Sequence, residues 1–350
     1  MMKREKKRLI FLPLIIIFTM SCTCGAPGLK NFLPENTENE VSTVDIQPAE
    51  KIEEPVPMEN EAPEPAIKNG TTGGDIEVYN VNHYDSDGWV TFVGHVRNNM
   101  DVVVSSVDIS MILFDGDGKI IATESIYPQL SLLPPGKDVP FYFSSENLNN
   151  FASYEIVVDE WYESDEEIPS GLEIVYDTAI LDEYNMTIIG EIENTSDQPM
   201  EWVHVASSLY DQNDILIDVV STYSMLDIIP AGGKSPFKMY MSQNWGSDTE
   251  YALIVQSSIA AEDAPMITVG GVEVTQDDYS VIFTGTVKNE TDIEHTYVNI
   301  VASLYDENGK LVAAEWGFIE EDSLPANGTG TFELTIWDCP EYAVIEYQAQ

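Results

Sequence analysis

Carboxylates and glycines alternate in Asp115-Gly116-Asp117-Gly118, and Glu124 follows shortly after. Closely spaced oxygen ligands of this kind are what a calcium-binding loop offers. A loop of the EF-hand type carries its glycine in the sixth place and its last carboxylate in the twelfth. Counted from Asp115, Gly118 is fourth and Glu124 tenth, and the same residues are typical of a hairpin turn. Asp115 and Asp117 are therefore candidate calcium ligands, with a hairpin turn as the preferred interpretation.

Aromatic side chains could instead recognise a partner. Several of them do not recur in register in the repeats described below, so we expect some to lie outside the common core: Trp161, Tyr162, Trp202, Trp245, Trp316 and Trp337. Met200, Trp202 and His204 form the patch with the strongest case, because aromatic residues and methionine are enriched where proteins bind partners. The alternative is a small satellite core beneath a loop. These three residues are the candidate binding site for a protein or a glycan.

Enzymatic chemistry has little support in this chain. It has four histidines, no Gly-x-Ser-x-Gly segment and no His-Glu-x-x-His segment. His95, His204 and His295 fall at different positions of the repeats, so the sequence indicates no shared histidine site. Cys339 precedes Pro340 and has no repeated histidine beside it, so we expect a structural thiol rather than a nucleophile. We expect no catalytic residue and no cofactor.

The first residues predict export. Lysine and arginine crowd positions 1–8, positions 9–18 are almost wholly apolar, and Ser21-Cys22 follows. This is the pattern of a secretory signal peptide, and the apolar stretch is too short to span a membrane. The small residue before Cys22 resembles the lipobox of bacterial lipoproteins. That resemblance implies a lipoprotein signal peptide over 1–21, a lipid on Cys22 and anchoring at the extracytoplasmic face of the cell membrane. The alternative is an ordinary signal peptide cut near Ser21 or Ala26.

Positions 22–74 alternate proline with glutamate and offer few large apolar side chains, which predicts a disordered acidic linker. The whole chain has 15 lysines and arginines against 61 aspartates and glutamates, a net charge of −46. Such a chain repels phosphate backbones, which excludes nucleic acid as a partner. The acidity could serve to bind cations or a basic ligand, but solubility is preferred because acids occur in every segment. Apart from Cys22, only Cys24 and Cys339 remain, and we expect both to be free thiols.

Repetition reveals the elements that position these residues. Three markers recur in the same order: Gly94–Asn98, Gly190–Asn194 and Gly285–Asn289; Leu113–Asp115, Leu209–Asp211 and Leu304–Asp306; Leu133-Pro134, Ile229-Pro230 and Leu324-Pro325. The period is longer than that of solenoid or propeller repeats, so each copy predicts a small domain with its own core. We place the domains at 75–164, 172–259 and 266–350, separated by acidic breaks.

Within each copy the apolar period is two. Alternate residues from Val90 to Val96 and from Val107 to Leu113 are apolar or glycine, and both patterns recur in the later copies. We therefore predict an all-β chain of three tandem antiparallel immunoglobulin-like β-sandwich domains after the signal peptide and the linker. The mid-strand glycines predict a bulge or the close approach of an aromatic ring. The asparagine that ends each Gly-x-Val/Ile-x-Asn strand predicts local backbone hydrogen bonds and tolerance of left-handed geometry, with a repeated ligand site as the alternative.

The Leu-Tyr-Asp strand, the Gly-x-Val/Ile-x-Asn strand before it and the Leu/Ile-Pro turn after it resemble the FxLYD domain of extracytoplasmic bacterial proteins, often lipoproteins. The resemblance covers 75–350 in three copies, and Met111, Ser207 and Ala302 stand where the family has phenylalanine. It implies an immunoglobulin-like β-fold and carries over no catalytic residue.

These observations predict a surface-displayed, non-enzymatic lipoprotein that presents β-sandwich domains to a protein or a glycan. A second hypothesis is an adhesin-like stalk rigidified by calcium, with carboxylates at the breaks 165–167 and 262–263 stiffening the joints. A third and weaker hypothesis is an accessory subunit of an enzyme.

Overall fold

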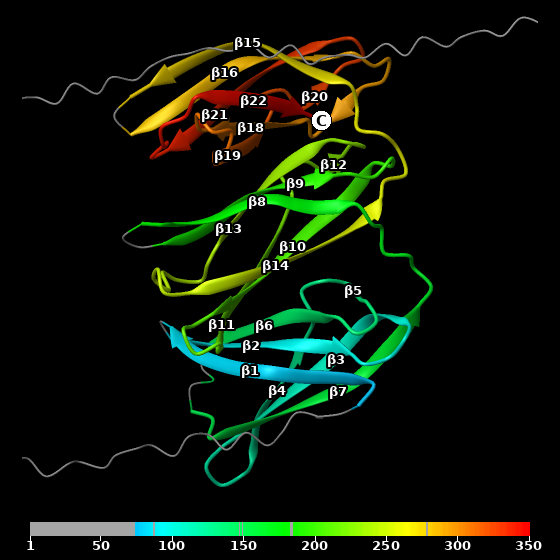
Figure 1. Ribbon diagram of the computed structural model, residues 1–350, viewed down its shortest axis with the longest axis vertical. Coiled ribbons are helices and arrows are strands. Elements are labelled where there is room, and N and C mark those ends of the chain that lie inside the picture. The colour runs from blue at the N-terminus through cyan, green and yellow to red at the C-terminus, as the bar shows by residue number, and fades with distance from the viewer. Residues whose placement is uncertain (1–73, 87, 147, 149, 183–184, 278) are drawn as a thin grey trace, which may run out of the picture.

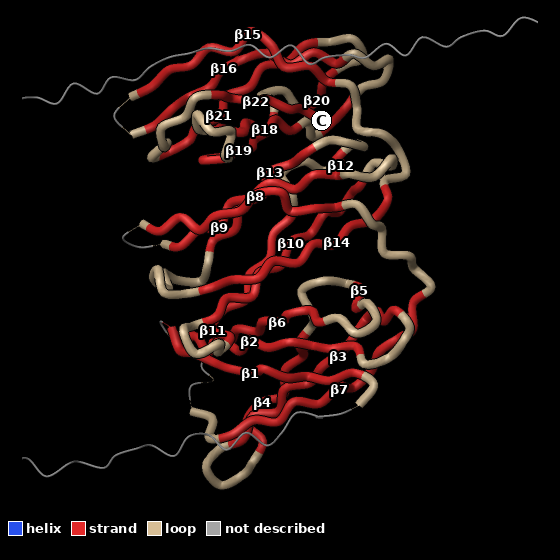
Figure 2. Tube along the Cα trace, viewed as in Figure 1, coloured by secondary structure: helices blue, strands red, loops and turns tan. Residues whose placement is uncertain are grey.

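The computed structural model describes residues 74–350 except 87, 147, 149, 183–184 and 278. The predicted signal peptide, Cys22, Cys24 and the linker up to residue 73 lie outside the described residues. Within the described part the chain is all β, with strands joined by loops and no helix (Figure 2). Accordingly, no described helix is long and apolar enough to cross a membrane. The strands form antiparallel sheets, which confirms the predicted all-β antiparallel fold class. We group the sheets into three successive units, and their equivalence to the three predicted domains stays a prediction.

Unit 1 packs two sheets face to face. In one sheet β2 lies between β1 and β6, and in the other β3 pairs with β4, β5 and β7. Its strands are β1 (Ile76–Ser86), β2 (Trp89–Asn98), β3 (Val103–Phe114), β4 (Ile120–Ile126), β5 (Leu132–Leu133), β6 (Asp138–Glu146) and β7 (Ser153–Ser164).

Unit 2 repeats this order. The first sheet runs β13-β9-β8, and in the second β10 pairs with β11, β12 and β14. Its strands are β8 (Leu172–Leu181), β9 (Met186–Asn194), β10 (Met200–Tyr210), β11 (Leu216–Tyr223), β12 (Ile228–Ile229), β13 (Lys234–Tyr240) and β14 (Glu250–Ile259).

Unit 3 has sheets of order β15-β16-β21 and β19-β18-β22, with the short pair β17-β20 beside them. Its strands are β15 (Ile267–Gln276), β16 (Ser280–Asn289), β17 (His295–Thr296), β18 (Asn299–Tyr305), β19 (Leu311–Phe318), β20 (Ser323–Leu324), β21 (Thr329–Trp337) and β22 (Val344–Ala349).

The predicted inner faces are confirmed. Val90, Phe92 and Val96 on β2 are fully buried, as are Met111 and Leu113 on β3. Period-two alternation works here because successive side chains of a strand point to opposite faces of its sheet. Each unit has an apolar cluster built from the inward residues of both sheets, and the cluster of unit 1 also includes Ala206 of unit 2. Independent folding of each unit stays a prediction.

The mid-strand glycines make room for aromatic rings, as predicted. Each glycine stands directly opposite a phenylalanine of the next strand in the same sheet. A Cβ atom at any of them would collide with that ring: Phe141 at Gly94, Phe237 at Gly190 and Phe332 at Gly285. The glycine is required because the far end of the ring occupies the space that a Cβ atom would take.

The repeated asparagine side chains cross-link neighbouring backbone segments by hydrogen bonds. Asn98 is fully buried, and its side-chain amide donates to the carbonyls of Val102 (2.7 Å) and Leu133 (2.9 Å) while its Oδ1 accepts from Met100 N (2.9 Å). Asn194 and Asn289 make the equivalent bonds. The predicted local hydrogen bonds are confirmed. The left-handed backbone is not found at these residues, because the amide itself closes the turn.

The three units are stacked one upon another, in contact through the sides of their sheets, rather than hung apart on their connectors (Figure 1). Apolar side chains fill both junctions. Val93 of unit 1 packs against Leu216 and Val219 of unit 2, and Ile189 of unit 2 occupies the equivalent place against unit 3: Val301, Leu311 and Ala314. The sequence predicted domains separated by acidic breaks and gave no contact between them. The contacts form because the outward faces of β2 and β9 carry apolar residues, which are stabilised when a neighbouring unit covers them.

A glutamine clamp recurs at each junction. Gln256 of unit 2 accepts from Leu132 N (3.0 Å) and donates to Leu132 O (2.5 Å) in unit 1. Gln350 of unit 3 makes the same pair of bonds to Ile228 of unit 2, accepting from its N at 2.9 Å and donating to its carbonyl. One side chain thus satisfies both polar groups of a backbone residue across the junction, which fixes the relative placement of two units.

Candidate functional site

A groove of about 750 Å³ lies where units 2 and 3 meet. Six large aromatic side chains with exposed surface line it, three from unit 2 and three from unit 3: Trp202, Tyr223, Tyr240, Tyr297, Trp316 and Phe318. The volume falls in the range of small-ligand pockets, about 300 to 1,000 Å³. Exposed rings gathered at one place set this groove apart from the rest of the surface, because isolated exposed apolar residues are ordinary.

Two of the exposed aromatic residues have a strained backbone conformation. Trp202 (φ 52°) and Tyr297 (φ 57°) are in the left-handed region, where bulky residues are rare. They occupy equivalent places in units 2 and 3, and Ser106 (φ 50°) takes this place in unit 1. On β10 the pairing with β14 shifts register between Glu201 and His204, which marks a β-bulge. The bulge turns the ring outward, and Trp202 is 68% and Tyr297 81% exposed.

The rings form two contacting pairs. Trp202 meets Tyr223 edge to face with 6.4 Å between centroids, and His204 stacks on Tyr223 at 4.3 Å. Across the groove, Trp316 and Phe318 make an edge-to-face pair at 5.4 Å. Such ring–ring contacts fix the orientation of the side chains and leave much of their surface exposed. Burial lowers the pKa of His204, so the imidazole that supports Tyr223 is neutral near pH 7.

The charges of the groove are mostly negative. Glu201, Asp227 and Glu315 line it, and Lys238 is the only base among the lining residues that the structure describes. Lys238 Nζ lies 3.2 Å from a Glu315 oxygen and 5.4 Å from the centre of the Tyr240 ring. Burial lowers the pKa of Lys238, but hydrogen bonding to Tyr240 and the charge of Glu315 outweigh it, so the pKa is raised. The groove thus already holds one ammonium between a ring and a carboxylate.

Asn299 contributes a polar group to the lining. Its side chain is 4% exposed, and its amide nitrogen donates to Met225 O at 3.3 Å. Its Oδ1 has no hydrogen-bond partner among the described residues. A buried acceptor without a partner is uncommon in folded proteins, and a ligand that donates a hydrogen bond would satisfy it.

The structure separates the three residues of the predicted binding patch. Trp202 is an exposed wall of the groove, whereas His204 supports it from behind through Tyr223. Met200 is 1% exposed and belongs to the core of unit 2, so its prediction as a binding residue is wrong. Met200 and Trp202 are two residues apart on a strand, but the bulge at Trp202 breaks the alternation that would have placed them on one face.

Sequence reasoning missed Tyr297, although the repeat contains the signal for it. Tyr297 follows Trp202 by one period, and an aromatic residue at both places marks a shared exposed position. It also missed Trp316 and Phe318 as partners of Trp202, because no local pattern says that β19 of unit 3 faces β11 and β13 of unit 2.

The candidate calcium ligands lie in a hairpin turn, which confirms the preferred interpretation. Asp115 Oδ1 accepts from the backbone of Asp117 (3.0 Å) and Lys119 (2.9 Å), and Asp211 and Asp306 do the same in units 2 and 3. Within the described part of the chain, no group of three or more His, Cys, Asp or Glu is placed to hold a metal ion. The acidic residues of both breaks are exposed.

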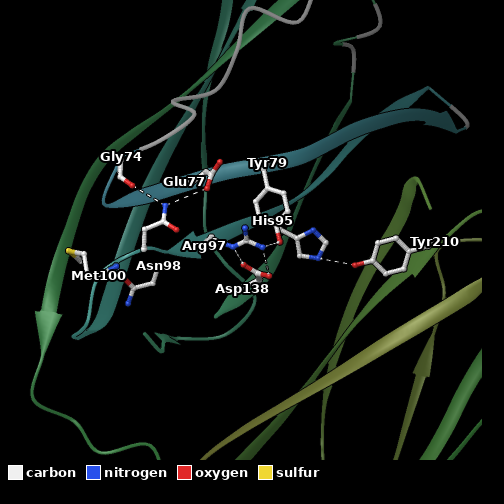
Figure 3. A network of polar contacts seen from close by, with 10 residues as sticks. Gly74, Glu77, Tyr79, His95, Arg97, Asn98, Met100, Asp138 and Tyr210 are labelled. Atoms are coloured by element: carbon white, nitrogen blue, oxygen red, sulfur yellow. Dashed lines mark hydrogen bonds and ion pairs between the residues drawn. The ribbon is translucent and has the colours of Figure 1, made fainter. Parts of the chain in front are cut away.

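A serine–histidine pair, His95 and Ser208, bridges units 1 and 2, and Figure 3 shows His95 beside Tyr210 of unit 2. His95 Nε2 lies 3.0 Å from Ser208 Oγ and 3.4 Å from the Tyr210 hydroxyl. His95 Nδ1 has no partner among the described residues, and both members of the pair are at least nine-tenths buried. A hydrolytic triad needs a carboxylate on Nδ1 and access for substrate. The pair therefore acts as part of the junction.

Beside this pair, Arg97 makes a two-pronged ion pair with Asp138 at 2.7 and 3.1 Å and donates to the Tyr79 hydroxyl at 3.0 Å (Figure 3). These groups sit on β1, β2 and β6 of unit 1. Cys339 is free and partly buried, and burial raises the pKa of its thiol to about 11, as expected of a structural cysteine.

No protein-family model and no curated protein matches the chain. Among solved structures, it is similar to a transglutaminase from red sea bream at 9% identity, over 52% of this chain and 29% of that one, with a TM-score of 0.16. It is also similar to a β-glucuronidase from glycoside hydrolase family 2 at 10% identity, over 70% of this chain and 25% of that one, with a TM-score of 0.17. The chain spans less than a third of the length of either protein.

Proposed function

We propose that this chain is a non-catalytic, lipid-anchored, extracytoplasmic binding protein of FxLYD type that presents the groove between units 2 and 3 to a protein or glycan. The observation that carries the proposal is the exposure of Trp202 and Tyr297 on strained backbone. A left-handed backbone destabilises an ordinary residue by on the order of 1 to 3 kcal/mol. Neither ring is buried, so hydrophobic burial of the side chain does not offset this free energy. Residues kept at such a cost are typical of binding sites.

Display of the groove outside the cell would depend on export and lipid anchoring through the N-terminal residues. The basic and apolar residues of 1–18 and the Ser21-Cys22 pair support export and lipidation. The acidic, proline-rich segment up to residue 73 suits a spacer between membrane and unit 1. A Cys22→Ala variant expressed in a bacterial host should move from the membrane fraction to the soluble fraction and lose incorporation of labelled palmitate. Retention of the label would contradict lipidation at Cys22.

Binding is tested with the full chain, purified in mild detergent and applied to arrays of peptides and of oligosaccharides. The expected result is a ligand whose binding is lost in the double variant Trp202→Gly/Tyr297→Gly. Trp337→Ala is the matched control, since Trp337 is 71% exposed and lies outside the groove. Absence of any ligand on both arrays, or equal binding by the double variant, would refute the groove as the working surface.

A stalk is the second candidate, and the stacking of the three units in one row favours it. The calcium-rigidified form of that hypothesis needs carboxylates that meet at the junctions. The junctions instead use apolar contacts and glutamine clamps, which would stiffen the stack without an ion. The stalk and the binding surface are compatible, because a rigid stack would hold the groove away from the membrane.

A further inference from the structure

We propose that the groove between units 2 and 3 binds an extended basic peptide, seating an arginine or lysine side chain among its rings and carboxylates. This inference rests on the proposed binding function and names the class of ligand. It starts from the pairing of aromatic faces with carboxylates, since a cation over an aromatic face is attracted by the negative charge of the ring.

The charge of the groove supports a cationic side chain. Three carboxylates line it against the single ammonium of Lys238, which is already paired with Glu315. Glu201 and Asp227 line it without an ion pair among the described residues. The chain as a whole carries −46, so a basic ligand would be drawn to this surface and an acidic one repelled.

Asn299 gives an independent reason. Its Oδ1 is a buried acceptor without a partner in the described structure, and it belongs to the lining of the groove. Guanidinium and ammonium groups carry only donors, so either would satisfy this oxygen while its charge meets the carboxylates. A carboxylate ligand could not, because it offers acceptors alone.

Strand edges around the groove favour a peptide over a small amine. β11, β13 and β19 are each the outermost strand of their sheets, and residues of all three line the groove. An outer strand leaves alternate backbone N–H and C=O groups free, and extended peptides bind by pairing with them. The side chains of such a peptide alternate, so every second residue would face the rings.

The probe is an acetylated and amidated heptapeptide of alternating threonine and arginine, titrated into the full chain by calorimetry. The control probe replaces arginine by citrulline, which keeps the shape and removes the charge. A neutral chitohexaose serves as the glycan arm. We expect the arginine peptide to bind with an affinity that falls as salt rises, and the citrulline peptide to bind roughly tenfold more weakly or worse.

Two variants locate the binding. Trp202→Gly removes a ring while relieving its left-handed backbone, so it should melt no lower than the parent chain and bind the peptide roughly tenfold more weakly. Glu201→Gln/Asp227→Asn should weaken binding and flatten its salt dependence. Glu333→Gln, an exposed acid on β21 outside the groove, is the matched control and should change neither.

The outcomes are distinguishable. Equal binding of arginine and citrulline peptides, or undiminished binding by both variants, overturns the cationic inference. Binding of chitohexaose alone, lost in Trp202→Gly, also overturns it while leaving the proposed binding function standing. A lower melting temperature for Trp202→Gly would assign the ring a packing role and remove the strain argument.

Discussion

His95 is a neutral histidine enclosed between two units. It is 5% exposed, and Ser208, Tyr210, Tyr79, Arg97 and Asp138 surround it. Burial lowers its pKa from 6.5 to about 4, and the charge of Asp138 offsets this only in part. The unfolded chain therefore takes up a proton at a pH where the folded chain does not.

Stability should accordingly fall as the pH drops from about 6.5 to about 4. The contribution of His95 is fully present above pH 6.5, is lost progressively below it, and amounts to roughly 3 kcal/mol when complete. Urea unfolding at a series of pH values checks this. His95→Gln keeps a hydrogen-bonding group but does not titrate, so it should remove this part of the slope. Identical slopes for both proteins would contradict the assignment.

At the scale of strands, the pairing of glycine with phenylalanine organises the first sheet of every unit. A Cβ atom on Gly190 would collide with Phe237 and lie 2.7 Å from the carbonyl oxygen of Tyr176, which cannot rotate away. Gly190→Ala should therefore lower the free energy of unfolding by about 1 to 3 kcal/mol, the usual cost of overpacking.

The matched control is Gly270→Ala. Gly270 also lies within a strand, β15, but a Cβ atom there would meet nothing within 4 Å. Its substitution should be neutral or slightly stabilising in the same denaturant titration, because alanine reduces the freedom of the unfolded chain. An equal loss at both glycines would mean that the ring contact is not the cause.

The glutamine clamps belong to the same scale, since each ties a short strand of one unit to the next unit. Gln256 on β14 holds Leu132 on β5, and Gln350, which follows β22, holds Ile228 on β12. Gln256→Ala leaves the N–H and C=O of Leu132 without these partners inside the junction, a cost of roughly 1 to 3 kcal/mol. Hydrogen exchange should show faster exchange at Leu132 and neighbouring amides. Gln212→Ala, in an exposed turn, should leave them protected. Unchanged protection in Gln256→Ala would show that the clamp does not hold the junction.

At the scale of the whole molecule, three acidic units stay in one stack because apolar side chains meet at their junctions. Val93 and Ile189 are covered by the following unit, whereas the equivalent residue of unit 3 is Thr284 and its neighbour Thr286 is exposed. The joining faces of units 1 and 2 are therefore apolar at both described junctions, whereas the equivalent face of unit 3 carries threonines. Burial of apolar surface supports the stack against the repulsion of its charges.

This predicts little response to calcium. Millimolar calcium should leave the melting temperature of the full chain within about 1 °C of its value in chelator, because an ion stabilises only if it binds the folded state preferentially. Differential scanning calorimetry at matched ionic strength, with magnesium as the control, measures it. A rise of several degrees specific to calcium would favour the cation-rigidified stalk and direct attention to the acidic breaks.

Local sequence patterns were enough to predict the strands, the turns and the repeat. Alternation at Val90, Phe92 and Val96 and the aspartate at each hairpin act between near neighbours in the chain, so their outcome does not depend on distant parts. The close approach of an aromatic ring to the mid-strand glycine and the backbone hydrogen bonds of the repeated asparagine could also be predicted, because three copies show the same residue at the same place.

The junctions and the groove depend on contacts between units and could not be predicted from local patterns. Tyr210 and Tyr305 end the repeated Leu-Tyr-Asp strands, yet their hydroxyls contact the preceding unit, at His95 and at Glu191. Trp202 and Trp316 share a groove although they belong to different units. Which outward residues meet depends on how one unit is rotated against the next. That rotation is set by contacts between residues that are far apart in the chain. Such contacts leave no signal in the local periodicity of the sequence.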